Sequence, residues 1–213
     1  MSYRTILSGM VGSYATRMPQ GPRGNRGPGA AAENRAALVA AAREVLADAG
    51  FDAPLSAVAR RAGVGQGSLY RHFPDRLSLA LAAFAENIAG LEAAAGRADS
   101  TLDDLLALLT EQAISATAFL DMLSGHAEDP RVAAMSQRVT AALAGKLPAA
   151  QRGGQFGDDV TPADLLMAIG MVSGLVARSP AAGRRATADR AWALLRRGLE
   201  GPGNRGCPAA ARE

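Results

Sequence analysis

The sequence is poor in the side chains from which most catalytic and metal sites are built. Its 213 residues include one cysteine and two histidines, and only 4% are aromatic. A single cysteine excludes an intrachain disulfide and a multi-cysteine metal site. With two histidines, the chain also has few general bases that could activate a nucleophile. The enzymatic alternative would be a carboxylate site from Asp103, Asp104, Glu128 and Asp129, positions that are typical of helix starts. We therefore expect no enzyme, no cofactor and no metal.

Long apolar runs and strand-like alternation are also absent. No stretch of about 18 or more uncharged apolar residues occurs, which argues against a transmembrane helix, and the amino terminus has no continuous apolar segment of the kind found in secretory signals. Hydrophobic residues nevertheless make up 48% of the chain, enough for a core. The sequence predicts an all-α cytoplasmic protein.

Acidic residues are missing from positions 1–32, which carry Arg4, Arg17, Arg23 and Arg26. The segment 19–30, PQGPRGNRGPGA, is rich in proline and glycine, so residues 1–32 are predicted to be a disordered extension. Three interpretations stay open: a tail without function, an upstream start that precedes Met18, or an arm on the DNA backbone. The net charge of +3 fits a partner with a phosphate backbone.

Helical periodicity and its breakers divide the rest of the chain. Apolar residues spaced three and four apart predict helices over 33–49, 55–62, 66–72, 76–95, 101–124, 129–147, 162–178 and 184–200. We expect a helix-turn-helix domain over 33–78, a second helical domain over 79–200 and a flexible tail over 201–213. A loop is expected at 148–159, PAAQRGGQFGDD.

Residues 62–73, AGVGQGSLYRHF, join two short predicted helices through a glycine-containing turn. This is the pattern of a helix-turn-helix unit, whose second helix enters the DNA major groove. Gly63 suits the positive φ of a sharp turn. Val64, Leu69 and Phe73 are expected to face the domain core.

The opposite side of the second helix is slim and polar. Gly67 would let the helix approach DNA closely, Gln66 suits an adenine edge, and Arg71 suits guanine or a phosphate. Phosphate oxygens can accept hydrogen bonds from the hydroxyl of Ser68, the phenol of Tyr70 and the imidazole of His72. The amino terminus of the next helix, together with Arg76, is also suited to a phosphate. Each residue also has an alternative role without DNA contact. Gln66 would be an inert surface residue, Tyr70 would pack on the fourth helix, and His72 would cap a helix. Arg60 and Arg61 would belong to a solvated face.

The run PLSAVARRAGVGQGSLYRHFPDRLSLALAAF, residues 54–84, resembles the DNA-binding domain of the TetR family of bacterial transcriptional regulators, and the resemblance covers about 33–92. It implies DNA contacts from Ser56, Gln66, Gly67, Ser68, Tyr70, Arg71, His72 and Arg76. One position departs from the family: Gly65 stands where a serine commonly caps the recognition helix, a difference of a few tenths of a kcal/mol.

The same resemblance implies a homodimer that binds a two-fold operator and a small-molecule effector. Candidate ligand-binding residues are Phe119, Met122, His126, Met135, Met167 and Met171, although methionine also serves as core filler. Candidate dimer-interface residues are Gly170, Ser173, Gly174, Leu194, Leu195 and Leu199, with ordinary core packing as the alternative. The expected function is a repressor released by an apolar or cationic small molecule; the alternative is a constitutive DNA-binding protein without an effector.

Overall fold

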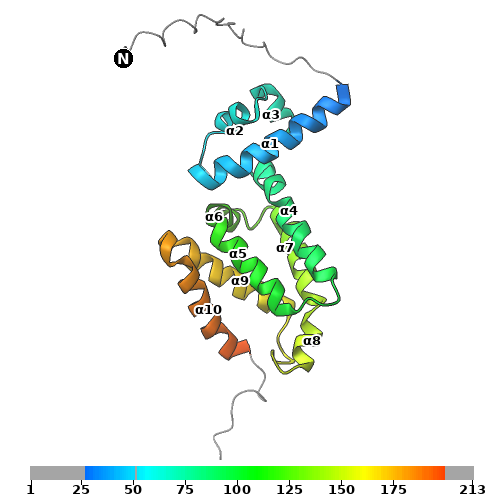
Figure 1. Ribbon diagram of the computed structural model, residues 1–213, viewed down its shortest axis with the longest axis vertical. Coiled ribbons are helices and arrows are strands. Elements are labelled where there is room, and N and C mark those ends of the chain that lie inside the picture. Colours follow the sequence, from blue (N-terminus) through cyan, green and yellow to red (C-terminus); the bar gives the residue numbers. More distant parts are fainter. Residues whose placement is uncertain (1–26, 51, 200–213) are drawn as a thin grey trace, which may run out of the picture.

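The structure is a computed structural model that describes residues 27–50 and 52–199, and every regular element in these ranges is a helix (Figure 1). The elements are α1 (Gly27–Ala49), α2 (Leu55–Ala62), α3 (Gln66–His72), α4 (Arg76–Gly96), α5 (Leu102–Ser115), α6 (Thr117–Gly125), α7 (Pro130–Ala144), α8 (Leu147–Arg152), α9 (Pro162–Ala177), the short 3₁₀ helix η1 (Ala181–Gly183) and α10 (Arg184–Leu199). The predicted all-α class is confirmed. The predicted disorder of residues 1–26 and 201–213 concerns segments outside the described residues.

Helix α1 begins six residues before the expected start at Glu33. Pro28 is compatible with a first helical turn, because the N–H that proline lacks would have no intrahelical partner there. The following Ala30, Ala31 and Ala32 have the highest helix propensity of all residues. Six residues that were expected to be disordered are therefore helical.

Two expected helices are interrupted. The helix predicted over 101–124 breaks at Ala116, where the Ser115 hydroxyl donates to the carbonyls of Glu111 and Gln112. Such back-bonding by serine bends helices. The helix predicted over 129–147 ends at Ala144, and α8 occupies part of the predicted loop. Pro148 has no N–H for the hydrogen bond that would continue α7, which explains the separate start of α8.

The first hydrophobic core joins α1, α2 and α3 to the amino-terminal half of α4. Leu69 of α3 and Phe73, the residue that follows α3, are almost completely buried and pack with Leu38 of α1, with Val64 half-buried beside them. Burying a leucine or phenylalanine side chain stabilises the fold by roughly 1.5–3 kcal/mol. The predicted inward face of α3 is therefore confirmed.

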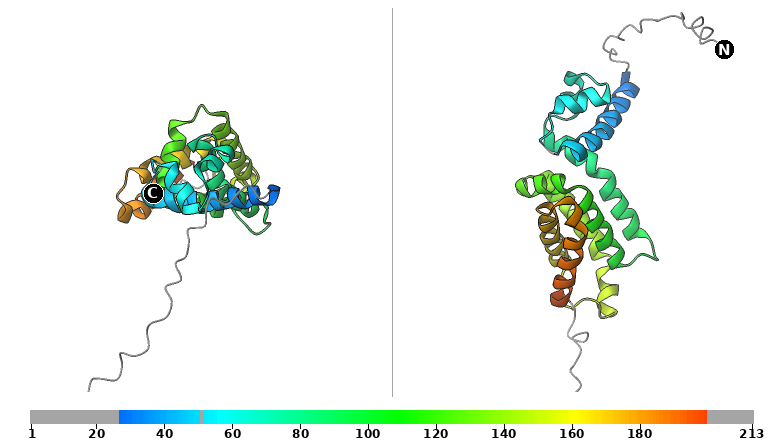
Figure 2. Two further views of the ribbon diagram at one scale, coloured as in Figure 1. Left: turned by 90° about the horizontal axis from the view of Figure 1, so that it is seen from above. Right: turned by 60° about the vertical axis from the view of Figure 1, so that its left-hand side comes forward.

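The second core lies in the remaining helices, below α1–α3 in Figure 1 and in the right-hand view of Figure 2. Helix α9 runs through this half and packs on α5, α6, α7 and α10. Trp192 of α10 donates its indole N–H to the Thr110 hydroxyl of α5 at 2.8 Å. This bond fixes the last helix to the body of the domain.

Helix α4 belongs to both cores. Leu79 and Ala83 pack in the first, whereas Phe84, Ile88 and Leu91 pack in the second. By length and composition alone α4 is apolar enough to cross a membrane, but its apolar side chains are used in protein packing. The expected domain boundary between residues 78 and 79 falls inside this helix, so the first core extends beyond it.

Candidate nucleic-acid interface

The turn between α2 and α3 sets the direction of α3. Gly63 ends α2 with φ 65° and ψ 26°, in the left-handed region that favours glycine. The Val64 N–H donates to the Ala59 carbonyl at 3.0 Å, which closes the turn. Gly65 then begins α3 with φ −65° and ψ 144° and makes no side-chain cap. The positive φ predicted for Gly63 and the missing cap at Gly65 are both confirmed.

The outer face of α3 is open to solvent. Gln66, Gly67, Tyr70 and Arg71 are exposed, and Tyr70 keeps 54% of its surface accessible. Its ring is therefore not buried against α4, the alternative position considered for it. We call Gln66, Gly67, Tyr70 and Arg71 the α3 outer face; their contact with DNA stays a prediction.

The shorter polar residues at this end of the molecule are half-buried. Ser68 and His72 of α3 and Ser56 of α2 each retain part of their surface. Half-buried side chains next to exposed ones can still reach a phosphate group that lies against the helix. Their predicted roles remain open in this geometry.

Arg76 has a structural partner that the sequence did not predict. Its guanidinium donates to the carbonyl of Ala53, in the segment before α2. This hydrogen bond ties the start of α4 to the start of α2. Arg76 therefore helps to position the two helices that flank α3, and a DNA contact would be an additional role.

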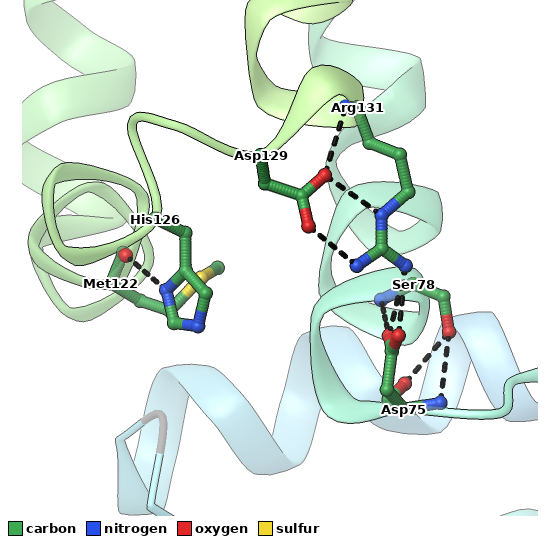
Figure 3. A network of polar contacts seen from close by, with 6 residues as sticks. All are labelled: Asp75, Ser78, Met122, His126, Asp129 and Arg131. Carbon is green, nitrogen blue, oxygen red and sulfur yellow. Dashed lines mark hydrogen bonds and ion pairs between the residues drawn. The ribbon is translucent and has the colours of Figure 1, made fainter.

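The amino terminus of α4 carries an ion-pair network (Figure 3). Asp75 caps the helix by accepting from the Ser78 N–H at 2.6 Å, which confirms the predicted cap. The guanidinium of Arg131 lies between two carboxylates, 2.9 Å from Asp75 Oδ2 and 2.8 Å from Asp129 Oδ2. The network joins the start of α4 to the start of α7. Asp75 lies two residues after Phe73, the residue that ends α3.

The hydrogen bonds of this network shift the acidity of both carboxyls. Hydrogen bonds from the side chain and backbone of Arg131 lower the pKa of Asp129 to about 2. The Ser78 backbone N–H, with a smaller contribution from Arg131, lowers the pKa of Asp75. Asp129 also caps α7, as expected for a helix-start acid. The sequence contained no signal for the pair of Arg131 and Asp75, because the two residues are 56 positions apart.

Two cavities in the described part of the chain bear on ligand binding. The first, of about 430 Å³, is bounded by α1, α4, α6 and the start of α10, and the second, of about 260 Å³, lies among α4, α5, α6, α7 and α9. Phe84 lines both. Of the predicted ligand-binding residues, Phe119 lines the first cavity and Met135 the second.

The other predicted ligand-binding residues line neither cavity. Met122 is buried, and His126 is exposed at the end of α6, with Nδ1 2.9 Å from the Met122 carbonyl oxygen (Figure 3). Met167 and Met171 are on the outer surface of α9, with 60% and 48% of their surface accessible. Their four-residue spacing places them together on the side of α9 that faces away from Leu165 and Val172. Ligand binding by these two methionines is therefore not supported by either cavity and stays a prediction.

The predicted dimer-interface residues separate into two groups. Gly170 and Leu194 are exposed, and Gly174 is partly so. Ser173 is buried, and Leu195 and Leu199 are half-buried against the cores; the dimer contact of all six residues stays a prediction. Gly170 and Ser173 also line the second cavity. We call the exposed set Met167, Gly170, Met171, Leu175 and Leu194 the α9–α10 face.

A short helix with a polar outer face, set on a glycine turn above a helical body, defines a helix-turn-helix DNA-binding protein. Residues 38–83 match the family model described as bacterial regulatory proteins, tetR family. Residues 38–83 therefore resemble the DNA-binding domain of the TetR family of bacterial transcription regulators, and the described helices have the fold of solved TetR-family regulators.

Solved structures show the same fold over most of the chain. A TetR transcriptional regulator from Streptomyces coelicolor has 28% identity and a TM-score of 0.55, covering 79% of this chain and 99% of its own. A TetR-family regulator from Pectobacterium atrosepticum has 20% identity and a TM-score of 0.59, with coverages of 82% and 98%. Reduced NemR from E. coli has 16% identity and a TM-score of 0.58, with coverages of 79% and 99%. Among curated proteins no match is found.

Proposed function

We propose that this regulator is a cytoplasmic homodimeric repressor that binds a two-fold symmetric operator and releases it when a small molecule binds. The observation that carries the proposal is the α3 outer face, where polar and glycine residues are exposed beside a fully packed inner face. A helix of this shape fits the major groove, and two copies related by a dimer axis would read two half-sites. The alternative is a regulator that binds DNA without an effector.

Within the α3 outer face the residues have different tasks. Arg71 and Gln66 carry the donors that can read base edges, and Gly67 leaves room for close approach. Tyr70 offers a phenol to the phosphate backbone, which fixes the register of the helix without reading sequence. Loss of a base contact costs about 1–3 kcal/mol, or about 5- to 150-fold in affinity.

The α9–α10 face supports the dimer. It places three large apolar side chains of α9, Met167, Met171 and Leu175, on one exposed strip, and Leu194 of α10 is also exposed. Exposed apolar patches on two adjacent helices are typical of an interface, and two such pairs would form a four-helix contact. Gly170 allows the partner helix to approach closely, since nothing lies within 4 Å of where its Cβ would be.

DNA binding is tested by fluorescence anisotropy with DNA that flanks the gene, across a salt series. The double variant Tyr70→Ala, Arg71→Ala should lose sequence-selective binding. Arg152→Ala is the charge control, because Arg152 is exposed on α8 at the other end of the molecule (Figure 1). Binding that is weak, steeply salt-dependent and equal for scrambled DNA would contradict the proposal.

The dimer and the effector have separate tests. Met171→Glu should give monomers in sedimentation velocity, whereas Ala93→Glu, an exposed change on α4, should leave the dimer intact. Dimers that persist in Met171→Glu would place the interface elsewhere. If ligands that raise the melting temperature never weaken operator binding, the protein is a constitutive DNA-binding regulator.

A further inference from the structure

The first cavity lies between the two halves of the molecule. Its walls come from Arg43 and Leu46 of α1, Phe84 and Asn87 of α4, Phe119 of α6, and Arg184 at the start of α10. Helix α1 belongs to the DNA-binding half, and α6 and α10 belong to the other half. A ligand in this cavity would therefore touch both halves at once.

Two arginines in the cavity wall have buried nitrogens without partners. Arg43 donates Nε to the Ala83 carbonyl at 2.7 Å and pairs Nη1 with Glu86. Its Nη2 atom is buried, and so is Nε of Arg184; neither has a hydrogen-bond partner among the described residues. A buried charged donor without a partner is costly. Both arginines line the cavity, so their guanidinium groups are the charged donors of its wall.

The rest of the wall is apolar with a few neutral polar groups. The rings of Phe84 and Phe119 stack with centroids 3.9 Å apart and an interplanar angle of 15°, and Leu46 adds aliphatic surface. The polar side chains beside the arginines are Asn87, Ser115 and Thr117, and among the described lining residues none is a carboxylate. Arg43 is paired with Glu86, which does not line the cavity, and the cavity wall itself presents positive groups without a carboxylate.

We propose that the first cavity binds a small organic acid, with its anionic head on Arg43 and Arg184 and its apolar body against Phe84 and Phe119. Guanidinium groups bind carboxylate, phosphate and sulfonate oxygens through charge-assisted hydrogen bonds. A volume of about 430 Å³ lies within the size range of small-molecule sites. An acidic ligand differs from the apolar or cationic one expected from the sequence.

The site would also regulate DNA binding, and this part rests on the proposed function. An acid that bridges Arg43 of α1 and Arg184 of α10 favours one orientation of the DNA-binding half relative to the other half. It changes operator affinity only if that orientation differs from the one that fits DNA. Operator DNA would in turn change the affinity for the acid by the same factor.

The test compares two fluorescent probes that differ in one acidic group. 8-Anilinonaphthalene-1-sulfonate carries an apolar ring system and a sulfonate, and N-phenyl-1-naphthylamine is its neutral counterpart. The wild-type protein should bind the sulfonate at one site per chain and about 10-fold more tightly than the neutral probe, the margin expected from charge-assisted hydrogen bonds. Arg184→Gln and Arg43→Gln should each remove this margin and leave neutral-probe binding unchanged.

Arg185→Gln is the matched control, because Arg185 is the next residue along the chain, is exposed and pairs with Glu111 outside the cavity. It should bind both probes like the wild type. Circular dichroism confirms folding of each variant, and either arginine variant suffices if the other is unfolded. The proposal is overturned if the sulfonate does not bind, if both probes bind equally, or if neither arginine variant changes the ratio.

Operator binding, measured by anisotropy in the same preparations, separates this proposal from the proposed function. DNA binding together with arginine-independent probe binding would overturn the organic-acid site and leave the repressor intact. Arginine-dependent probe binding without any selective DNA binding would support the site and contradict the repressor.

Discussion

Replacing Gly67 with alanine should change folding stability and DNA affinity in opposite directions. Gly67 is the second residue of α3, and nothing lies within 4 Å of the position that its Cβ would take. The new methyl group therefore meets no atom of the free protein. It would, however, stand on the α3 outer face, which is proposed to lie in the DNA groove.

The expected magnitudes follow from these two environments. A glycine inside a helix is less favourable than alanine by about 0.5–1 kcal/mol, which corresponds to a rise in melting temperature of roughly 1–4 °C for a chain of this size. Forcing an extra carbon into a close-packed contact costs about 1–3 kcal/mol. Operator affinity should therefore fall by about 5- to 150-fold for each recognition helix.

Calorimetry and operator anisotropy on the same samples measure both effects. Gly90→Ala is the control, because Gly90 is an exposed residue within α4, also has no atom within 4 Å of its Cβ position and lies away from α3. It should stabilise the protein without weakening DNA binding. A Gly67→Ala variant that binds the operator as tightly as the wild type would refute close approach of α3 to DNA.

Three further changes test other parts of the structure. Gly63→Ala forces a side chain into φ 65° and should lower stability by about 1–2 kcal/mol, measured by urea unfolding. Thr110→Val leaves the Trp192 indole N–H without its acceptor and should cost about 1–3 kcal/mol in the same assay, where no change would contradict the bond. The pKa of Asp129 is about 2 in the folded protein and 3.8 for an ordinary aspartate. Its contribution to the free energy of unfolding is therefore complete above pH 3.8 and is lost as the pH falls through about 2. Arg131→Gln should raise that pKa toward the ordinary value in a carboxyl NMR titration; an unchanged value would contradict the network.

The elements around the turn were predictable because strong local signals bound them. Gly63 and the Phe73-Pro74 pair end α2 and α3 where the sequence indicates. The break at Ala116 has no glycine or proline to mark it, and it lies next to the Ser115 hydroxyl that donates to the Glu111 carbonyl. Local breakers are visible in a sequence, whereas a competing side-chain hydrogen bond depends on the folded geometry.

The DNA-binding face was easier to predict than the ligand site for a similar reason. In α3 the apolar Leu69 is buried, whereas Gln66, Gly67, Tyr70 and Arg71 are exposed, so its two faces differ clearly in the sequence. Helix α9 is apolar around most of its circumference, so periodicity did not distinguish exposed Met167 from buried Leu165. Arg43 and Arg184 meet only through tertiary packing, and no sequence spacing relates them.

The sharing of α4 between two cores has a consequence for protein engineering. A chimera that exchanges the carboxy-terminal half of this protein for that of a related protein cannot be joined in a flexible linker, because none separates Arg76 from Gly96. A junction after residue 78 would replace Leu79 and Ala83 with residues of the other protein. The first core would then lose two of its buried side chains. Fusions should therefore carry α4 intact through Ala83 and match the helical phase of the incoming segment, since each added or deleted residue rotates everything beyond it by about 100°.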